Sequence, residues 1–231
     1  MDIKDFGKFE QGIGFIFNDK VLLRQAFTHR SYINENREEG LEHNERIEFL
    51  GDAVLELVVT NYLFFKYPEK PEGELTAFRS ALVNTASLAS VAAKLGMSEY
   101  LLLSRGEERD TGRARQYILA DTLEAFIGAL YLDQGYEKAG EFIARELFPT
   151  LTDIVEKRLW QDAKSHFQEK AQDRVNITPT YKTVEEIGPD HDKEFVVAVY
   201  LKDEEIAQGK GLSKQEAQTK AAEKALQAKQ W

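Results

Sequence analysis

One stretch decides what this chain is built around: His43-Asn44-Glu45-Arg46-Ile47-Glu48-Phe49-Leu50-Gly51-Asp52-Ala53-Val54-Leu55. It predicts a helix, and at about 100° per residue three acids fall on one side, namely Glu45, Glu48 and Asp52. Apolar residues fall on the other side, which we expect to face a core: Ile47, Leu50, Val54, Leu57 and Val58. A helix anchored in this way holds its carboxylates more rigidly than a loop does.

A second helix of the same kind is predicted at Tyr117-Ile118-Leu119-Ala120-Asp121-Thr122-Leu123-Glu124-Ala125-Phe126-Ile127. Its acids, Asp121 and Glu124, are three residues apart and therefore share a face. Two such helices side by side would gather five carboxylates, which repel one another unless protons or cations bind. Clustered oxygen ligands of this kind suit Mg²⁺ or Mn²⁺.

The acidic stripe has a simpler interpretation, because charged stripes on helices are usually solvated faces. Gly51 favours a metal site instead. Glycine inside a helix costs about 1 kcal/mol relative to alanine, so we expect something to approach this backbone closely. Phe49 projects beside the acids and not toward the core, which indicates an interface as the alternative to local packing. Glu56 also falls on the acidic side, and we expect it to be solvated.

The composition indicates a soluble, cytoplasmic protein without a membrane partner. The 231 residues are 42% hydrophobic, and their uninterrupted apolar runs are far shorter than the roughly 18–20 residues of a membrane span. The first residues lack the layout of a signal peptide. The lack of cysteine excludes disulfides and thiolate zinc sites, and the four histidines do not have His-Glu-x-x-His spacing.

The net charge of −10 argues against a polyanionic partner until it is divided along the chain. Residues 1–158 carry 19 basic and 27 acidic residues, whereas residues 159–231 carry 11 and 13. Within 209–229, five lysines stand against two glutamates. The acidity therefore lies mainly with the predicted carboxylate cluster, and the C-terminal end has a basic segment.

Two domains of different texture are predicted, residues 1–158 and 163–231, with a linker at 159–162. The first is all-α, with amphipathic runs near 19–30, 42–67, 74–95, 115–134, 136–148 and 151–159. The second is a small α+β domain with the order α-β-β-β-α. Its predicted helices cover 163–173 and 213–229, and its strands cover 180–186, 194–201 and 204–208. Ser213 is expected to cap the last helix.

The segment Asn44-Glu45-Arg46-Ile47-Glu48-Phe49-Leu50-Gly51-Asp52 is very similar to the signature of the ribonuclease III family. Ala120-Asp121-Thr122-Leu123-Glu124-Ala125 resembles the second catalytic motif of that family, and 26–32 and 71–76 match further blocks. The resemblance runs over nearly the whole chain. It implies a helical-bundle catalytic domain that dimerises and a Mg²⁺-dependent cut in double-stranded RNA. The products would have 5′-phosphate and 3′-hydroxyl ends with short 3′ overhangs.

The same resemblance implies roles for single residues. The implied inner metal site consists of Glu48, Asp52, Asp121 and Glu124. The implied catalytic residues are Asp52 and Glu124, with Glu45 and Glu72 as supporting acids. Glu72 is expected in a turn, where Glu74 remains its rival. Phe49 matches the residue that inserts into the partner subunit of a homodimer, and we expect His29 and His43 to be structural.

The second domain resembles a double-stranded RNA-binding domain through Lys164-Ser165-x-Phe167-Gln168-Glu169, 178–181, 188–191 and 209–214. The resemblance implies that RNA contacts Gln168, Glu169, His191, Lys210 and Lys214, through minor grooves and phosphates. Bases usual in the family are replaced by Gln215 and Gln218, so we expect weakened RNA binding. Residues 209–214 lack the spacing of a phosphate-binding loop, so no nucleotide cofactor is expected.

The sequence therefore predicts a homodimeric endoribonuclease of the ribonuclease III family that uses Mg²⁺, with Mn²⁺ as a substitute. Its expected substrates are structured RNAs, such as precursors of ribosomal, messenger and transfer RNA. A different class of protein, one that binds double-stranded RNA on the same fold without cutting it, is the alternative. Because every acid of the family motif is present, the sequence favours the enzyme. A small-molecule metal phosphohydrolase would leave the second domain without a purpose.

Overall fold

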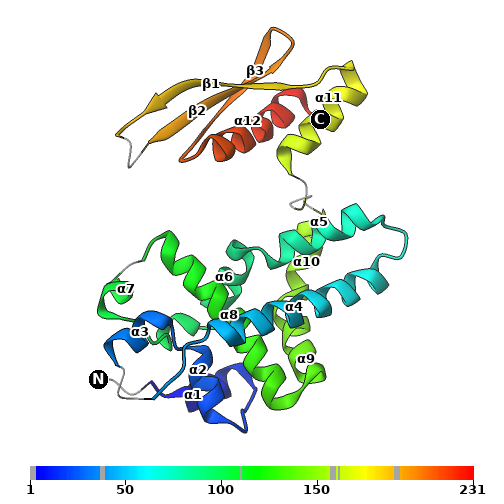
Figure 1. The fold of residues 1–231 in the computed structure, drawn as a ribbon. Helices are drawn as coiled ribbons and strands as arrows, with labels where there is room; N and C mark the ends of the chain where they lie inside the picture. Colours follow the sequence, from blue (N-terminus) through cyan, green and yellow to red (C-terminus); the bar gives the residue numbers. More distant parts are fainter. Residues whose placement is uncertain (1–3, 37–39, 110, 157–159, 161, 190–192) are drawn as a thin grey trace. The chain divides into compact units, whose positions relative to one another are not determined.

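The chain forms two compact units, Met1–Trp160 and Gln161–Trp231, which we call the helical unit and the sheet unit. The computed structural model describes residues 4–36, 40–109, 111–156, 160, 162–189 and 193–231. Figure 1 shows helices throughout the first unit, and a three-stranded sheet with two helices in the second. None of the described helices combines the length and the apolar character that crossing a membrane requires.

The helical unit is all-α, as predicted. Its elements are α1 (Phe6–Ile13), α2 (Lys20–Ala26), α3 (Arg30–Glu35), α4 (Glu45–Lys66), α5 (Glu72–Val83), α6 (Thr85–Lys94), the 3-10 helix η2 (Met97–Glu99), α7 (Arg105–Arg109), α8 (Arg113–Gln134), α9 (Tyr136–Glu146) and α10 (Phe148–Glu156). Strand-like pairing within the described part of this unit is limited to a bridge between Thr28 and Leu102.

Two predicted helices are each divided in the structure. The run at 19–30 ends as α2 at Ala26, and α3 begins anew because the His29 side chain accepts a hydrogen bond from the Ser31 amide. The run at 74–95 is divided at Asn84, whose extended backbone and side-chain oxygen begin α6. The first part of this run also starts earlier than predicted. Glu72 is the first residue of α5, so the prediction that it lies in a turn was wrong.

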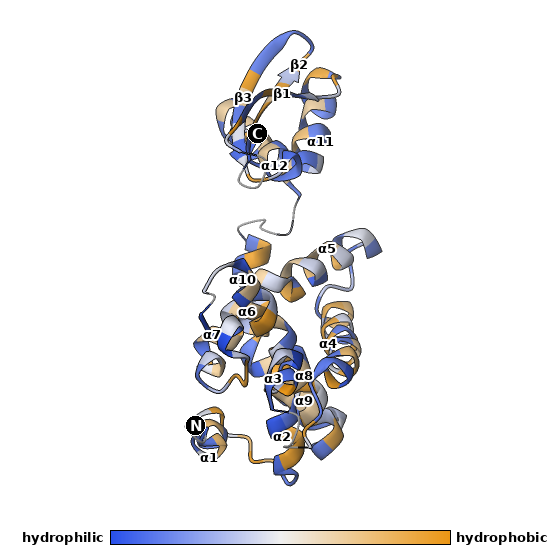
Figure 2. Ribbon diagram, turned by 60° about the vertical axis from the view of Figure 1, so that its left-hand side comes forward, coloured by the Kyte–Doolittle hydropathy of each residue, from blue (hydrophilic) through white to orange (hydrophobic). Residues whose placement is uncertain are grey.

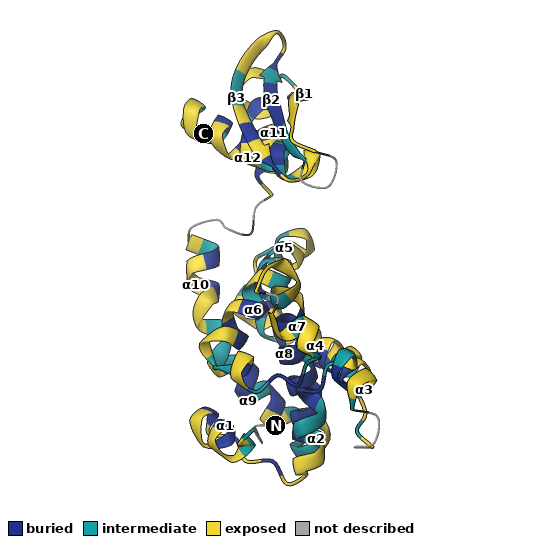
Figure 3. Ribbon diagram, turned by 90° about the vertical axis from the view of Figure 1, so that its left-hand side faces the viewer, coloured by how far each residue is buried: buried dark blue, intermediate teal, exposed yellow. Residues whose placement is uncertain are grey.

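The centre of the helical unit is α8. From Ile118 to Leu130, every residue of this helix is buried except Asp121 and Glu124, which are half-buried. Figure 3 shows the dark blue of buried residues gathered around α8 and yellow along the outer helices. The two acids therefore project from a helix that is otherwise almost entirely core.

The other acid-bearing helix, α4, buries a broader side than predicted, because Leu55 and Val59 are also buried and extend the core side toward the acids. Ile47, Val54 and Val58 are buried, as expected from their spacing, and Leu50 is half-buried. The prediction for Leu57 was wrong, because 58% of its surface is exposed. It lies about 80° around the helix from Phe49, on a side that the unit leaves uncovered. Figure 2 shows hydrophobic and hydrophilic residues interspersed along this helix.

The boundary between the units falls at Trp160. The Trp160 ring lies edge-on against Phe78 of the helical unit, with ring centroids 4.9 Å apart. Asp162 accepts a hydrogen bond from the Lys164 amide and so caps the first helix of the sheet unit. These two residues of the predicted linker at 159–162 thus each belong to a unit.

The sheet unit is an antiparallel sheet of order β1-β2-β3 with two helices packed on it. Its elements are α11 (Ala163–Val175), β1 (Thr180–Ile187), β2 (Glu194–Leu201), β3 (Glu204–Gly211) and α12 (Lys214–Lys229). The order α-β-β-β-α is the predicted one, and the Ser213 hydroxyl caps α12 as predicted. β3 runs three residues further than predicted, since Gly209 and Gly211 continue the ladder with β2 under α12.

Candidate metal centre

The start of α4 is fixed by Asn44, a buried polar residue. Its side-chain amide donates a hydrogen bond to the Ala26 carbonyl (3.2 Å), and its backbone amide donates one to the Thr28 carbonyl (2.9 Å). The Asn44 carbonyl in turn accepts from the amides of Ile47 and Glu48. The first turn of α4 is therefore tied to the turn after α2, and the acids that follow start from a fixed point.

Two glycines let the backbones of α4 and α8 touch. A Cβ atom at Gly51 would lie 1.8 Å from the Glu124 carbonyl oxygen, and one at Gly128 would lie 2.3 Å from the Ile47 carbonyl oxygen. No side chain fits at either position. The prediction that something approaches the backbone at Gly51 closely is thus confirmed, and the approaching element is α8 at Glu124. This crossing sets the acids of one helix beside those of the other.

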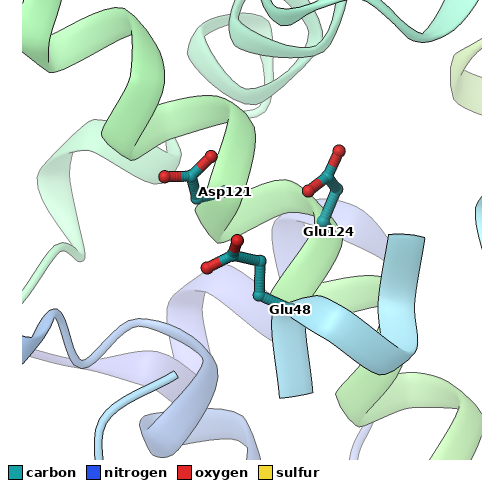
Figure 4. A group of neighbouring side chains, drawn as sticks. All are labelled: Glu48, Asp121 and Glu124. Carbon is teal, nitrogen blue, oxygen red and sulfur yellow. The ribbon is translucent and has the colours of Figure 1, made fainter. Parts of the chain in front are cut away.

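Three carboxylates meet at the crossing. Glu48 projects from α4, and Asp121 and Glu124 project from α8 toward the same space (Figure 4). One oxygen from each lies within 4.8 Å of the others, and all three side chains are half-buried. Asp52, the fourth member of the predicted inner set, is exposed and stands outside this group, although its charge acts on Glu124.

The cluster makes ionisation of its members unfavourable. Burial, followed by the charges of Asp52, Asp121 and Glu48, raises the pKa of Glu124 to about 8. Burial, followed by Asp121, Glu45 and Asp52, raises the pKa of Glu48 to about 7. Near neutral pH these two carboxyls therefore hold protons for much of the time.

The donor set fits a divalent metal ion of hard character. Such ions prefer carboxylate oxygens, and the described cluster offers three of them from two rigid helices. A cation would relieve the repulsion that raises the pKa of Glu48 and Glu124, and it would displace their protons. Burial also raises the pKa of Asp121, against the opposing effect of His29.

The two outer acids lie apart from this group. Glu45 is held by Arg30 at 3.3 Å and faces the His43 imidazole at 3.7 Å, while its charge acts on Glu48. Glu72 is exposed and accepts a hydrogen bond from the Thr76 hydroxyl.

Its rival Glu74 is already paired with Lys70 at 2.7 Å. Of the two acids in this short segment, Glu72 is thus the one whose carboxylate is not neutralised by that lysine. The His29 ring caps α3, as expected of a structural residue. Burial lowers the pKa of His29, against the opposing charges of Glu107, Asp121 and Glu45.

A stripe of apolar side chains is exposed along α4. Phe49 is 80% exposed, and Leu57 and Phe64 lie on the same side of the helix, within about 80° of it. Phe65 is also exposed and lines a pocket of about 650 Å³. The other residues that line this pocket are Val58, Asn61, Tyr62, Lys66, Tyr136, Glu137, Gly140 and Phe148.

Four of the residues with an implied role in RNA binding are exposed in the sheet unit. Gln168 and Glu169 lie on α11, Lys210 on β3, and Lys214 is the first residue of α12. The fifth, His191, lies outside the described residues.

Three residues of structural consequence were not predicted from the sequence. Asn44 stands inside the quoted motif, but its burial depends on a loop elsewhere in the chain. Gly128 could have been noticed because it lies inside a long apolar helix, as Gly51 does in the other acid-bearing helix. Glu186, which pairs with Lys214 at 3.1 Å, gave no signal in the sequence.

Comparison with known proteins places both units. A family model described as ribonuclease-III-like matches residues 19–151, and a double-stranded RNA binding motif matches residues 163–229. The ribonuclease 3 of Anoxybacillus flavithermus is 47% identical over 96% of this chain and 92% of its own length. The ribonuclease 3 of a Geobacillus species is 48% identical over 96% of this chain and 90% of its own.

A solved structure supports the fold of the helical unit. The nuclease domain of ribonuclease III from Campylobacter jejuni aligns with 64% of this chain and 97% of its own, at 42% identity and a TM-score of 0.58. The four acids of the implied inner metal site lie in the part of the chain that the ribonuclease-III-like model covers. On these similarities, which span nearly its whole length, the chain belongs to the ribonuclease III family.

Proposed function

We propose that this protein is an endoribonuclease that hydrolyses phosphodiester bonds in double-stranded RNA, in the cytoplasm, as a metal-dependent homodimer. One observation carries the proposal: three half-buried carboxylates converge at a helix crossing, in a chain that also contains a double-stranded RNA binding motif. Similarity to proteins named ribonuclease 3 supports the same activity. Precursors of ribosomal, messenger and transfer RNA are the substrates we expect.

Glu48, Asp121 and Glu124 would hold the metal ion, and Asp52 would complete the set. We propose Mg²⁺ as the ion and Mn²⁺ as a substitute, because both accept carboxylate oxygens. A divalent ion bound there would supply activation of water and neutralisation of the charge on the phosphodiester. A reaction at this carboxylate cluster therefore needs no protein nucleophile.

The protonation states of the chain's own carboxyls determine when the site can bind a metal ion. Burial and mutual repulsion raise the pKa of Glu48 to about 7 and of Glu124 to about 8, so both must lose protons before they can act as ligands. Asp52 is exposed beside them, and we assign to it and Glu124 the orientation of the attacking water. Glu45 and Glu72 would position the RNA backbone or its water shell from outside the inner set.

A homodimer would use the exposed stripe of α4. Phe49, Leu57 and Phe64 leave an apolar surface that water covers in the single chain. In a twofold pair with antiparallel α4 helices that cross near Leu57, Phe49 of one copy meets the other helix near Phe65. That residue lines the aromatic pocket, whose volume of about 650 Å³ can take a phenyl ring.

The dimer also explains the products that we propose. One chain carries one carboxylate cluster among its described residues, and cutting two strands at opposite positions needs two. Two sites related by a twofold axis would cut both strands and leave 5′-phosphate and 3′-hydroxyl ends with short 3′ overhangs. The sheet unit would hold the duplex by its A-form shape, through Gln168 and Glu169 in a minor groove and Lys210 and Lys214 at phosphates.

The test is cleavage of a long perfect RNA duplex by the full chain with Mg²⁺, with Mn²⁺ and with a chelator. Glu124→Gln should lower the rate by about 10²–10⁴-fold, the order expected for a lost metal ligand. Glu56→Gln is the matched control, because Glu56 is an exposed acid of α4 outside the three-carboxylate cluster. The products should be short duplexes with 5′-phosphates.

Tight duplex binding without cleavage in either metal would contradict the enzyme. It would leave the alternative, a double-stranded RNA-binding protein on a nuclease fold. Cleavage that persists at full rate in the chelator, or in Glu124→Gln, would instead remove the carboxylate cluster from the reaction.

A further inference from the structure

Lys214 is the basic residue in the stretch of sequence that begins α12. No other basic residue occurs between Gly211 and Thr219. The helix it begins has 16 residues, and the positive end of its dipole adds to the charge of the lysine. The ion pairs that this ammonium group makes therefore affect how strongly a phosphate binds at the N-terminus of the helix.

The Lys214 ammonium is already engaged within the sheet unit. It lies 3.1 Å from a carboxylate oxygen of Glu186 and 5.4 Å from the centre of the Phe195 ring. Glu186 is opposite Phe195 in the β1–β2 ladder, so the carboxylate reaches the lysine across the neighbouring strand. The other oxygen of Glu186 lies 3.4 Å from the Lys193 ammonium.

The two lysines hold Glu186 in its ionised form. Hydrogen bonds from Lys214, and then from Lys193, lower the pKa of this carboxyl. The contact of Lys210 with Glu194 is looser, at 3.9 Å. Among the lysines with an implied role in RNA binding, Lys214 is thus the one with the closer acidic partner.

We propose that Glu186 competes with RNA for Lys214, and so sets the RNA affinity of the sheet unit from within the chain. The inference rests on the proposed function, because it assumes that the chain binds double-stranded RNA. A phosphate can pair with Lys214 in two ways. It can displace the Glu186 carboxylate, or it can bind beside this carboxylate and be repelled by its negative charge. Glu186 thus weakens the contact twice, once through the pair that breaks and once through repulsion of the phosphate.

Lys193 makes it easier for Lys214 to leave Glu186 for a phosphate. When Lys214 turns to a phosphate, Glu186 keeps Lys193 as a partner and is not left as a bare charge beside the RNA. Both Lys214 and Glu186 are partly exposed, with side-chain exposures of 57% and 39%, so water and salt screen their pair. An exposed pair of this kind shifts an equilibrium by about two- to fivefold, which is a tuning effect and not a block.

Glu185 provides a matched control. It is the neighbouring residue on β1, it is also an exposed glutamate, and it is opposite Val196 in the ladder. Successive side chains of a strand point to opposite faces, so Glu185 points away from Lys214. Substitution of either glutamate by glutamine changes the net charge equally, but only one substitution frees the lysine.

The experiment measures binding of the full chain to a duplex of about 20 base pairs, longer than one such domain spans, by fluorescence anisotropy in a chelator. Glu186→Gln should tighten binding about two- to fivefold, and Glu185→Gln should change it by less than about twofold. The Glu186→Gln plot of log affinity against log salt should also be steeper, because an unpaired Lys214 exchanges ions more fully. In a Lys214→Gln background the gain from Glu186→Gln should vanish.

Two results would overturn the inference while RNA binding itself stands. One is an equal effect of Glu186→Gln and Glu185→Gln. The other is an undiminished gain from Glu186→Gln without Lys214, which would mean a general effect of charge. A wild-type chain that does not bind the duplex at all would overturn the proposed function as well.

Discussion

The two units place their functional charges in opposite ways. In the helical unit, three carboxylates are half-buried at a crossing where the backbones of α4 and α8 touch through Gly51 and Gly128. In the sheet unit, the corresponding charges are exposed lysines on long side chains, such as Lys214, held only by other side chains. The first arrangement is fixed by packing, and the second is set by competition with solvent, salt and neighbouring acids.

The comparison predicts different sensitivities. A methyl group at the crossing should do great damage, because the core has no room for it. Removal of a whole charged side chain from the sheet unit should do much less, because water and other residues replace part of what is lost.

The largest effect is expected from Gly51→Ala. The new methyl group would collide with the Glu124 carbonyl at 1.8 Å, so α4 and α8 must separate and the carboxylates must move apart. We expect a loss of about 1–3 kcal/mol or more in the free energy of unfolding and nearly complete loss of cleavage. Urea denaturation and the duplex cleavage assay measure the two effects.

Gly12→Ala is the control for this substitution. Gly12 lies in α1, and a Cβ atom there would meet nothing within 4 Å. The substitution should leave cleavage unchanged and stabilise the helix slightly, as alanine does in open helical positions. Equal tolerance of alanine at both glycines would show that the crossing does not hold the site.

The next effect concerns an exposed side chain of the helical unit. If Phe49 is a central contact of a homodimer, Phe49→Ala should weaken the dimer by about 2–4 kcal/mol, a rise of roughly 30- to 1000-fold in the dissociation constant. Val21→Ala, at another exposed apolar residue, should have no effect on it. Sedimentation over a range of concentrations distinguishes the variants, and an unchanged dimer in Phe49→Ala would refute the proposed contact.

A smaller effect, a gain in the free energy of unfolding at high pH, is expected from Glu124→Gln without metal. Burial and neighbouring charges raise the pKa of Glu124 from 4.5 to about 8, so the folded state of the wild type binds the proton more tightly than the unfolded state. The wild type should therefore lose stability as the pH rises from about 4.5 to about 8, and the variant should be spared this loss.

At pH 9 we expect Glu124→Gln to be the more stable protein, by on the order of 1–2 kcal/mol once screening by solvent is allowed for. At pH 4 the two proteins should be alike, since both side chains are then neutral. Urea denaturation in a chelator at the two pH values measures the difference. A wild type that is more stable than the variant at pH 9 would contradict the assigned repulsion.

The smallest effect is expected from Lys214→Gln in the sheet unit. Loss of one phosphate contact should weaken duplex binding about fivefold near physiological salt and reduce the slope of log affinity against log salt by somewhat less than one unit. Binding titrations at several salt concentrations measure both quantities. A loss of binding as complete as the loss of cleavage in Gly51→Ala would remove the contrast between the units.

The parts of this molecule that depend on local pattern were predictable from the sequence. The helical spacing correctly predicted that Ile47 is buried, and Ser213 marked the start of α12. Gly51 correctly indicated a close approach. These features follow from a few neighbouring residues and the periodicity of one element.

Features that depend on distant parts of the chain were not predictable in this way. Leu57 has the spacing of a core residue, but no neighbouring element covers it. The break at Asn84 is an exception, because its cap is local: the Asn84 side chain accepts a hydrogen bond from the Ser87 amide inside an otherwise helical run. The partner of Lys214 comes from another strand, and the convergence of Glu48 with Glu124 depends on where α8 crosses α4.

The central claim is that the carboxylates at this crossing bind a divalent metal ion, and titration of the full chain with Mn²⁺ in a calorimeter at pH 7 tests it most directly. We predict binding that releases protons, because Glu48 and Glu124 must deprotonate, and binding that weakens at least about tenfold in Glu124→Gln. Glu56→Gln should bind like the wild type. Equal binding by all three proteins, or binding without proton release, would contradict the account.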